Sequence, residues 1–481
     1  MSAGQLLPLF PLATVLVPGL VLPLHIFEPR YRQLVADLQA LPEDDREFVV
    51  VAIRDGREVG TDGARALFDV GTVTSVREVS PLDDGRFDIV TVGTRRVRIG
   101  ELDTSLPYLR ATVPYQPPIR DDLRGATPYG APQLDVPVRL NTNENPFPPS
   151  PALATAIGAA AGAAAADRNR DPERDAHSLR QRLAAYLGRE SDVSLHADQI
   201  WAANGSNEVM HHIFSAFGGP TRTALAFSPT YSMYEQYARD TFTRYVTVRR
   251  DPDFSLDATT VVAAMLGGSP SIVVLTSPNN PTGTALPLEV VAAACATATG
   301  VVVVDEAYAE FRRPGVPSAL SLLPGNPNLI VTRTMSKAFA LAGARLGYAV
   351  ACPEVIDALR VVRLPYHLSA ITQAVASTAL DHADELQGQV DTLRRERDDL
   401  LSWLRDRGVR AVDSDANFIL FGMFADQHRA WQGLLDRGVL VREVGPEGWL
   451  RVTVGTPADN AAFRAALEVV ISEDGMMAPS E

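Results

Sequence analysis

Short, continuous apolar runs that alternate with helical segments constrain the fold of this chain more than any other feature. Beyond about residue 119 the apolar runs are residues 224–227, 272–275, 301–304 and 329–331. Helical propensity or periodicity is found at residues 153–166, 179–187, 290–298, 386–404 and 460–471. Apolar runs that alternate with helices in this way indicate a largely parallel sheet buried on both faces. The sequence therefore predicts an α/β fold for this part of the chain.

Unusual polar segments follow each of the four apolar runs directly. They are residues 228–231 (SPTY), 276–283 (TSPNNPTG), 305–308 (DEAY) and 332–337 (TRTMSK). Since ligands of open α/β sheets bind outside the carboxyl ends of the strands, we expect these segments to share one rim. They would bring an aromatic ring, an amide, a carboxylate with a phenol, and an amine to that rim.

The amine belongs to Lys337, the only lysine among the 44 basic residues of the chain. Arginine can provide charge and phosphate contacts, but it does not lose its proton in proteins. Forming an imine with a carbonyl compound requires a primary amine that can become neutral. Taken alone, a surface lysine retained by chance explains Lys337 equally well, but the neighbouring segments favour the chemical role.

Together these groups match the requirements of pyridoxal 5′-phosphate. Lys337 would form the Schiff base with the aldehyde, and Asp305 would keep the pyridine nitrogen protonated so that the ring withdraws electrons. Asn280 and Tyr308 can hydrogen-bond the phenolic oxygen, and Tyr231 is placed to stack on the ring face. The phosphate requires backbone N–H groups at a helix start, hydroxyl groups and a cation. The predicted phosphate ligands are Gly205, Ser206, Asn207, Thr334, Ser336 and Arg345.

Residues from about 119 to 475 resemble the fold-type I pyridoxal-phosphate-dependent aminotransferases, and specifically the histidinol-phosphate aminotransferases. The segments that carry the resemblance are residues 140–146 (LNTNENP), 204–208 (NGSNE), 277–283 (SPNNPTG), 305–308 (DEAY), 334–345 (TMSKAFALAGAR), 363–369 (RLPYHLS) and 450–456 (LRVTVGT). The resemblance implies a large, mostly parallel sheet domain, about residues 165–365. It also implies a small α/β domain formed by the N-terminal arm and about residues 366–475.

The resemblance also implies a reaction and further site residues. Arg451 would bind the α-carboxylate of the substrate bidentately, and Arg442 would bind the phosphate of histidinol phosphate. Asn145 and Tyr129 would lie at the substrate end. The implied reaction exchanges an amino group between L-histidinol phosphate with 2-oxoglutarate and imidazole acetol phosphate with glutamate, in a ping-pong cycle through a Lys337 aldimine. The family further implies a homodimer with the active site at its interface.

Two alternative functions remain open at this point. An aromatic amino-acid aminotransferase could use the same scaffold, although Arg442 and Tyr129 favour a phosphorylated substrate. A weakly active or non-catalytic protein is the other alternative, in which the first part of the chain binds polypeptides. The spacing of His177, His211, His212 and His367 gives no metal-ligand pattern with cysteines or carboxylates, so we expect no metal site.

One segment departs from the pattern of the family. Residues 169–172 read Asn-Arg-Asp-Pro, where these enzymes usually have Asn-Arg-Tyr-Pro and the tyrosine reaches the cofactor phosphate of the neighbouring subunit. Asp171 would bring a negative charge towards a dianion, with a repulsion of up to ~4 kcal/mol at about 4 Å and an effective dielectric constant near 20. We therefore expect weaker cofactor binding, unless Asp171 turns away and Arg345 with the helix start suffices.

The first 115 residues form a different, β-rich module. Strands are predicted at residues 48–53, 70–76, 87–92, 97–99 and 109–113, and a helix near residues 30–38. Residues 8–12 (PLFPL), 22–31 (LPLHIFEPRY) and 93–97 (GTRRV) resemble the N-terminal substrate-binding domain of Lon-type proteases. The resemblance implies a small barrel-like module that binds polypeptide or another partner. Without a P-loop or a second lysine, ATP-driven proteolysis is excluded for this chain.

The predicted order along the chain is thus the β module (1–115), a linker (116–120), the aminotransferase (121–475) and a tail (476–481). A net charge of −14 argues against nucleic acid or anionic membrane as a default partner. No apolar run approaches the roughly 18–20 residues of a membrane span. Two cysteines do not make a disulfide framework. We therefore expect a cytoplasmic protein.

Overall fold

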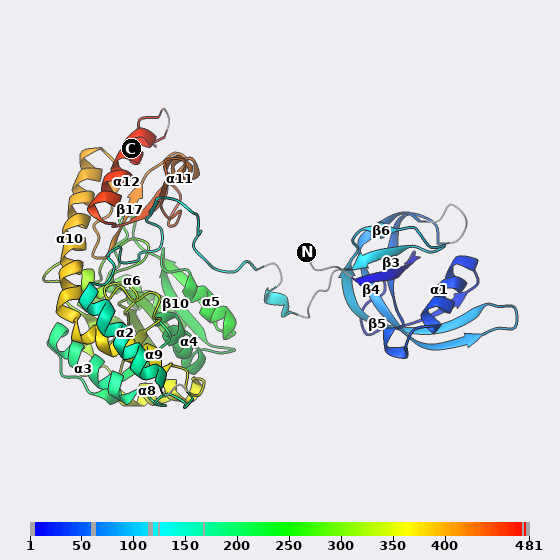
Figure 1. Ribbon diagram of the computed structural model, residues 1–481, viewed down its shortest axis with the longest axis horizontal. Coiled ribbons are helices and arrows are strands. Elements are labelled where there is room, and N and C mark those ends of the chain that lie inside the picture. Colours follow the sequence, from blue (N-terminus) through cyan, green and yellow to red (C-terminus); the bar gives the residue numbers. More distant parts are fainter. Residues whose placement is uncertain are drawn as a thin grey trace. The chain divides into compact units, whose positions relative to one another are not determined.

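The computed structural model describes residues 5–58, 64–113, 119–123, 126–166, 169–473 and 476–477. The chain divides into two compact units, Met1–Pro128 and Tyr129–Glu481 (Figure 1). Most of the predicted linker (116–120) and of the predicted tail (476–481) lies outside the described residues, so those boundaries stay predictions. Among the described helices, none is both long enough and apolar enough to cross a membrane.

The first unit is built on one seven-stranded sheet. Its strands are β1 Gln5–Leu12, β2 Val21–Ile26, β3 Glu47–Gly56, β4 Ala64–Pro81, β5 Phe87–Arg98, β6 Leu102–Asp103 and β7 Arg110–Val113. They pair in the order β2-β5-β4-β3-β1-β7-β6, and β1–β3 is the parallel pair. The two strands predicted at residues 87–92 and 97–99 are one continuous strand, β5. Neither β1 nor β2 was predicted, because prolines interrupt their apolar pattern.

Both faces of this sheet bury apolar side chains. On one face Phe10, Phe48 and Ile89 pack with helix α1 (Pro29–Gln39), whose buried residues are the four on its predicted face: Tyr31, Leu34, Val35 and Leu38. On the other face side chains from β1, β3, β4, β5 and β7 pack against one another. Since strands alone enclose that second core, the sheet curls on itself, which gives the barrel-like form that was predicted. The short 3-10 helices η1 (Glu43–Asp45) and η2 (Asp121–Leu123) complete the unit.

The second unit contains the predicted, mostly parallel sheet. Its strands are β9 Ile200–Ala203, β10 Thr223–Ser228, β11 Arg244–Arg249, β12 Ile272–Thr276, β13 Val301–Asp305, β14 Leu329–Thr334 and β15 Gly347–Val350. Their order is β11-β10-β12-β13-β14-β15-β9, and only β15 runs antiparallel to its neighbours. The four predicted strands are confirmed as β10, β12, β13 and β14. The sequence did not reveal the peripheral strands β9, β11 and β15.

Helices cover both faces of this sheet, because successive side chains of each strand point to opposite sides. The helices are α2 Pro151–Ala166, α3 His177–Ser191, α4 Ser206–Phe217, α5 Met233–Asp240, α6 Ala258–Gly268, α7 Leu288–Thr297, α8 Pro353–Val362 and α9 Ala370–Asp381. Val273 and Leu275 of β12 pack with α3, α6, α7 and α9, and Ile272 and Val274 pack with α4, α5 and α8. The 3-10 helices are η3 Ala197–Gln199, η4 Ala309–Phe311 and η5 Ala319–Leu322.

A smaller sheet follows in the last third of the chain. Strands β16 (Arg410–Ala411), β17 (Phe418–Gly422) and β19 (Trp449–Thr453) pair antiparallel, and helices α10 (Ala383–Asp406), α11 (Gln427–Leu435) and α12 (Pro457–Ile471) pack on them. The arm that precedes α2 joins this part of the molecule, since β8 (Val138–Arg139) pairs with β18 (Val439–Leu440). This pairing brings residues 139–145 back towards the large sheet.

Candidate active site

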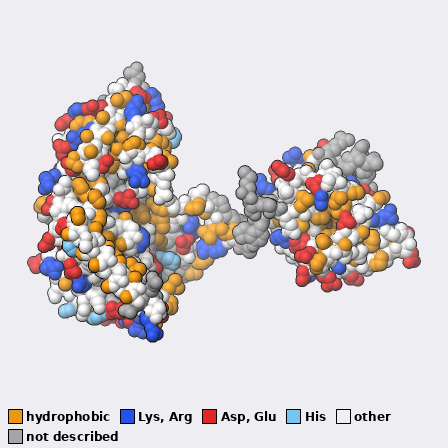
Figure 2. Space-filling view, viewed as in Figure 1, with side chains coloured by type: hydrophobic (Ala, Val, Ile, Leu, Met, Phe, Trp, Pro, Cys, Tyr) orange, Lys and Arg blue, Asp and Glu red, His pale blue; other side chains and the backbone are white. Residues whose placement is uncertain are grey.

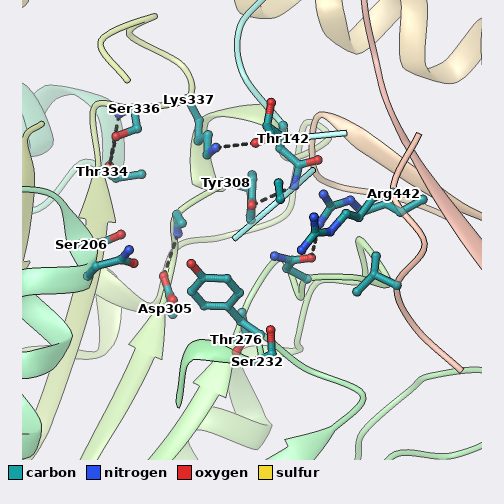
Figure 3. Close-up of a pocket in the computed structure, with 18 of the residues that line it drawn as sticks. Thr142, Ser206, Ser232, Thr276, Asp305, Tyr308, Thr334, Ser336, Lys337 and Arg442 are labelled. Carbon is teal, nitrogen blue, oxygen red and sulfur yellow. Dashed lines mark hydrogen bonds between the residues drawn. The ribbon is translucent and has the colours of Figure 1, made fainter. Parts of the chain in front are cut away.

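The carboxyl ends of β10, β12, β13 and β14 surround a cavity of about 260 Å³. Most of the predicted site residues line it: Tyr129, Ser206, Asn207, Tyr231, Asn280, Asp305, Tyr308, Thr334, Ser336, Lys337, Arg345, Arg442 and Arg451. In Figure 3, Ser206, Thr334 and Ser336 lie on one side of the cavity and Arg442 lies on the other. The cavity therefore has two polar ends.

Lys337 projects into this cavity from the turn that follows β14. Its Nζ donates a hydrogen bond to the backbone oxygen of Thr142 at 2.9 Å. Burial, together with the positive charges of Arg451 and Arg345, lowers the pKa of Lys337 to about 8. An amine in this state has an accessible neutral fraction near neutral pH, as imine formation and proton transfer both require.

Asp305 ends β13 and is 5% exposed. Its carboxylate accepts hydrogen bonds from the Tyr234 hydroxyl (2.7 Å), the Ala307 backbone N–H (3.2 Å) and the Thr332 hydroxyl (3.3 Å). Burial raises the pKa of Asp305, and none of the described ion pairs includes it. A buried carboxylate with hydrogen bonds but no counter-ion is suited to a cation supplied by a ligand.

The polar end next to Lys337 has the features of a phosphate site. Gly205 has a φ of +86° and precedes the first residue of α4, Ser206, so that the first N–H groups of the helix open into the cavity. The Thr334 hydroxyl donates to Ser336 Oγ at 3.0 Å. Arg345 Nη1 lies 3.5 Å from Ser336 Oγ and forms none of the described ion pairs, so its charge is available to an anion.

Tyr308 and Asn280 each have a hydrogen-bond donor that is left for a ligand in the cavity. The Tyr308 hydroxyl accepts a hydrogen bond from Asn143 Nδ2 at 3.0 Å, which leaves its own proton for a ligand. Asn280 Oδ1 accepts from Arg451 Nη1 at 2.6 Å, which orients the amide so that Nδ2 is the group left to donate. The ring of Tyr231 meets that of Tyr129 edge to face, with centroids 6.2 Å apart.

The other polar end contains two guanidinium groups. Arg451 is buried on β19; it bonds Asn280 Oδ1 and, at 2.9 Å, the backbone oxygen of Asn141, while its Nε has no partner among the described residues. Burial lowers the pKa of Arg451 to about 10. Arg442 is partly exposed and donates to the Gly130 oxygen at 3.3 Å. Two cations that form none of the described ion pairs thus face the end of the cavity opposite the predicted phosphate site.

Two predicted site residues do not line the cavity. Asn145 is directed elsewhere: its Nδ2 lies 3.3 Å from Gln389 Oε1 and 3.4 Å from the Ala338 oxygen, and its Oδ1 accepts from the Phe147 N–H. Gly205 affects the site only through its backbone conformation at the start of α4. Asn143, two residues before Asn145, takes the place at the cavity, and its φ of +57° marks the bend that directs it there.

The sequence interpretation also missed Tyr234, Thr142 and Thr276. Tyr234 follows the predicted stacking residue Tyr231 by three positions and is the second residue of α5. That spacing was the available signal. The contact of Lys337 with Thr142, in contrast, joins residues 195 positions apart and leaves no mark on the sequence.

The residues present fit pyridoxal 5′-phosphate. Asp305 has no cationic partner among the described residues, and a protonated ring nitrogen would supply one. Apart from Asp305, the described lining contains no acidic side chain, so an anion can be held at the phosphate end. Lys337 offers a primary amine in the same cavity. A Cβ atom on Gly347 would lie 2.1 Å from the backbone nitrogen of Ser206, so the close approach of β15 to the start of α4 depends on glycine. The donor set and this tight helix start are those that a phosphate ester requires.

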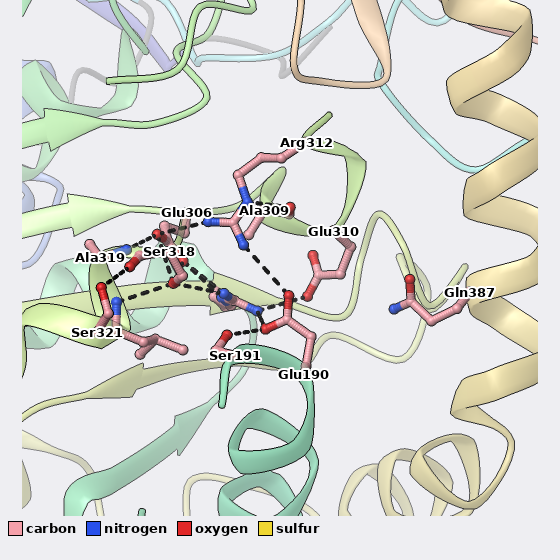
Figure 4. A network of polar contacts seen from close by, with 12 residues as sticks. Glu190, Ser191, Glu306, Ala309, Glu310, Arg312, Ser318, Ala319, Ser321 and Gln387 are labelled. Carbon is pink, nitrogen blue, oxygen red and sulfur yellow. Dashed lines mark hydrogen bonds and ion pairs between the residues drawn. The ribbon is translucent and has the colours of Figure 1, made fainter. Parts of the chain in front are cut away.

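A buried ionic network begins one residue beyond Asp305 (Figure 4). Arg333 is fully buried on β14 and donates to Glu306 Oε2 at 2.9 and 3.0 Å and to Glu190 Oε2 at 3.0 Å. Arg312 Nη1 lies 3.5 Å from Glu306 Oε1. Burial raises the pKa of Glu310 to about 7, and its Oε2 has no partner in the described part of the chain. The network joins β13 and β14 directly behind Asp305 and Lys337.

Two family patterns match the chain. Residues 136–467 match "Aminotransferase class I and II", and residues 6–131 match the "ATP-dependent protease La (LON) substrate-binding domain". The histidinol-phosphate aminotransferase of Thermobifida fusca is 63% identical over 350 residues, which cover 73% of this chain and 94% of that protein. That of Frankia casuarinae is 58% identical over 369 residues, covering 75% and 93%.

Solved structures agree with the sequence comparisons. The histidinol-phosphate aminotransferase of Sinorhizobium meliloti in complex with pyridoxal 5′-phosphate has a TM-score of 0.63 and 27% identity, covering 70% of this chain and 91% of that one. The aspartate aminotransferase of Thermus thermophilus with maleate has a TM-score of 0.60 and 27% identity, covering 69% and 90%.

Proposed function

Because the chain belongs to the class I and II aminotransferases and, among them, to the histidinol-phosphate aminotransferases, we propose that it uses pyridoxal 5′-phosphate to transfer the amino group between glutamate and imidazole acetol phosphate. The products are 2-oxoglutarate and L-histidinol phosphate, and the reaction is reversible. The observation that carries the proposal is that the single lysine, a buried carboxylate and two guanidinium groups meet in one cavity, and that none of the ion pairs in the described ranges includes the carboxylate or either guanidinium.

The cofactor, when bound, carries the amino group between the two substrates and withdraws electrons from the substrate carbon. Asp305 would hold its ring nitrogen, and Ser206, Ser336 and Arg345 its phosphate. Lys337 Nζ, with a pKa of about 8, is suited to accept and return the proton of the substrate carbon that bears the amino group.

Arg451 and Arg442 account for two substrates of different shape. Glutamate and 2-oxoglutarate carry two carboxylates, whereas histidinol phosphate carries no carboxylate and one phosphate. Each kind of substrate carries roughly two negative charges, which would lie at the same end of the cavity. A guanidinium group can bind carboxylate or phosphate oxygens bidentately. The buried Arg451 would bind the group next to the reacting carbon, and the more exposed Arg442 the second charge.

The chain is proposed to act as a homodimer. Large apolar side chains are exposed on a short stretch around α8 and α9: Val361 (83%), Leu364 (72%) and Ile371 (46%). Helix α2, which packs along α9, exposes most of its alanine-rich surface. Exposed apolar side chains on these segments favour burial against a second copy of the chain. Light scattering should give twice the 51.9 kDa of one chain, and Leu364→Glu should reduce it towards one.

The first unit is proposed to bind polypeptide. Between β1 and the end of β2 it exposes Val15 (67%), Leu20 (54%) and Val21 (61%), and Figure 2 shows apolar side chains among charged ones on its visible face. These side chains would contact unfolded or extended segments. Both cysteines are free, which fits the proposed location in the cytoplasm.

The proposed reaction is tested with the purified full-length chain. We expect visible absorbance from bound cofactor that borohydride changes, and turnover of histidinol phosphate with 2-oxoglutarate. Lys337→Ala and Lys337→Arg should lose both signals, because neither side chain offers an amine that can become neutral. Arg410→Lys, a substitution at an exposed arginine outside the cavity, is the matched control.

Phenylalanine with 2-oxoglutarate is the comparison substrate. Turnover of phenylalanine in preference to histidinol phosphate would identify an aromatic amino-acid aminotransferase and contradict the proposed substrate. A protein without cofactor absorbance, or with unchanged absorbance and turnover in Lys337→Ala, would contradict the reaction as a whole.

A further inference from the structure

Tyr234 contacts the carboxylate of Asp305 from outside the cavity. It lies on α5, is fully buried, and does not line the cavity. Its hydroxyl donates to Asp305 Oδ2 at 2.7 Å and lies 3.0 Å from Thr276 Oγ1. The distance to Asp305 is that of a hydrogen bond between a hydroxyl and an ionised carboxylate.

The direction of the bond follows from the carboxylate, because an ionised carboxylate can only accept, and the groups behind Tyr234 are compatible with it. Asn279 Nδ2 is used by the Pro229 oxygen (3.0 Å) and Thr282 Oγ1 (2.8 Å), so its Oδ1 is left to accept from the Thr230 hydroxyl (3.2 Å). With the Thr230 proton committed, Thr276 is left to donate its one proton either to Thr230 Oγ1 (3.1 Å) or to the Tyr234 hydroxyl oxygen (3.0 Å). Tyr234 in turn directs its proton at Asp305.

The other carboxylate oxygen has weaker support. Asp305 Oδ1 accepts from the Ala307 N–H at 3.2 Å and from the Thr332 hydroxyl at 3.3 Å. All the described partners of Asp305 therefore donate hydrogen bonds to its carboxylate. The hydrogen bond from Tyr234 is the shortest of them. Donors stabilise the ionised form of a carboxylate against the cost of burial.

The ring of Tyr234 has a second contact. It meets the ring of Tyr231 edge to face, with centroids 5.6 Å apart and an interplanar angle of 89°. Tyr231 lines the cavity and is the residue proposed to cover the face of the cofactor ring. Tyr234 thus contacts both Asp305, which would bind the ring nitrogen of the cofactor, and Tyr231, which would cover the ring face.

From these contacts we propose that Tyr234 is a positioning residue, whose hydroxyl keeps Asp305 ionised and oriented for the ring nitrogen of the cofactor. The inference rests on the proposed function and adds to it a residue that touches neither cofactor nor substrate. Tyr234→Phe separates its two contacts, because it removes the hydroxyl and keeps the ring against Tyr231.

The test measures cofactor binding to the protein after its cofactor has been removed. One probe is pyridoxal 5′-phosphate, and the other is the analogue in which a C–H group replaces the ring nitrogen. Tyr234→Phe should raise the dissociation constant of pyridoxal 5′-phosphate about ten- to a hundredfold, the range expected for losing a hydrogen bond to a charged group. The dissociation constant of the analogue should not change, because it has no nitrogen for Asp305 to hold.

Two variants act as controls. Tyr186→Phe removes another buried phenol hydroxyl, which accepts from Gln387 Nε2 at 3.1 Å outside the cavity, and should change neither constant. Thr332→Val removes the longer bond to Asp305 and should have a smaller effect of the same kind.

Equal weakening of both probes by Tyr234→Phe would assign the hydroxyl a merely structural role and overturn the proposal, as would no change for either probe. A different result would show that the proposed function itself is wrong. It would appear in the unsubstituted protein, as absence of pyridoxal 5′-phosphate binding or of transamination.

Discussion

At the scale of single residues, three ionisable groups of the cavity, Lys337, Arg451 and Asp305, form no ion pair in the described part of the chain. Burial lowers the pKa of Lys337 to about 8 and that of Arg451 to about 10, and it raises the pKa of Asp305. Each shift is towards the neutral form, as desolvation requires. A protonated ring nitrogen beside Asp305 and a carboxylate or phosphate beside Arg451 would supply the missing charges, so the site is prepared for ions that the chain does not contain.

Glu310 should make the stability of the second unit depend on pH. Its pKa is raised from 4.5 to about 7, so the folded chain binds this proton more tightly than the unfolded chain does. The stabilisation is present in full below pH 4.5 and is lost as pH rises through 7. Glu310→Gln keeps the group neutral, and its unfolding free energy relative to the natural chain should increase by up to ~3 kcal/mol between acid and alkaline pH.

Urea unfolding followed by tryptophan fluorescence checks this expectation, because all 4 tryptophans lie in the second unit. The exposed Glu354→Gln is the matched control and should show no such change. A constant difference between Glu310→Gln and the natural chain from pH 5 to 8 would contradict the assignment.

Asp171 is exposed in the single chain. In the proposed dimer, Asp171→Tyr should tighten the binding of pyridoxal 5′-phosphate, because it would replace a negative charge facing the dianion with a hydroxyl donor. Asp171→Asn separates these two effects, because it removes only the charge. Titration of the cofactor-free proteins measures both, and an unchanged dissociation constant in each variant would show that residue 171 does not reach the phosphate.

At the scale of elements, the phosphate end depends on how closely β15 approaches α4. The first N–H groups of α4 are usable only because Gly347 of β15 has no side chain there. Gly347→Ala would place Cβ 2.1 Å from Ser206 N and 2.4 Å from Gly205 C, so the start of the helix must move. We expect weaker cofactor binding and a loss of about 1–3 kcal/mol in unfolding free energy.

Gly267→Ala, at the end of α6, has nothing within 4 Å of the added Cβ and serves as the control. Cofactor titration and urea unfolding of both variants give the comparison. Similar behaviour of the two substitutions would mean that the approach of β15 to α4 can relax without moving the phosphate site.

At the scale of the whole molecule, the described lining of the cavity lies entirely within residues 129–451. The second unit also has its own hydrophobic cores, separate from the two cores of the first unit. A chain that begins at Tyr129 should therefore fold and keep the kcat/KM of the full-length protein for histidinol phosphate. Steady-state kinetics and tryptophan fluorescence measure both properties. Loss of activity in a folded truncated chain would show that the first unit contributes to catalysis.

The sequence was sufficient to predict most of the site residues that line the cavity. Lys337, Asp305 and Asn280 could be predicted because each follows a continuous apolar run, and the carboxyl ends of parallel strands meet at one edge. The edge strand β11 was missed because its burial is incomplete and its short apolar segment contains a threonine and is flanked by two arginines. Strands β9 and β15 are four residues each and too short to stand out from the turns beside them.

What the sequence by itself determined is thus the set of reactive groups and the edge of the sheet at which they gather, because both follow from local patterns. Only the tertiary structure decided which of two nearby asparagines enters the cavity, and that Tyr234 holds Asp305. The physical reason is that such contacts join residues far apart in the chain: Tyr234 and Asp305 are separated by 71 positions, and Asn143 and Tyr308 by 165. Their meeting depends on how helices and the N-terminal arm pack on the sheet, and no local pattern encodes that packing.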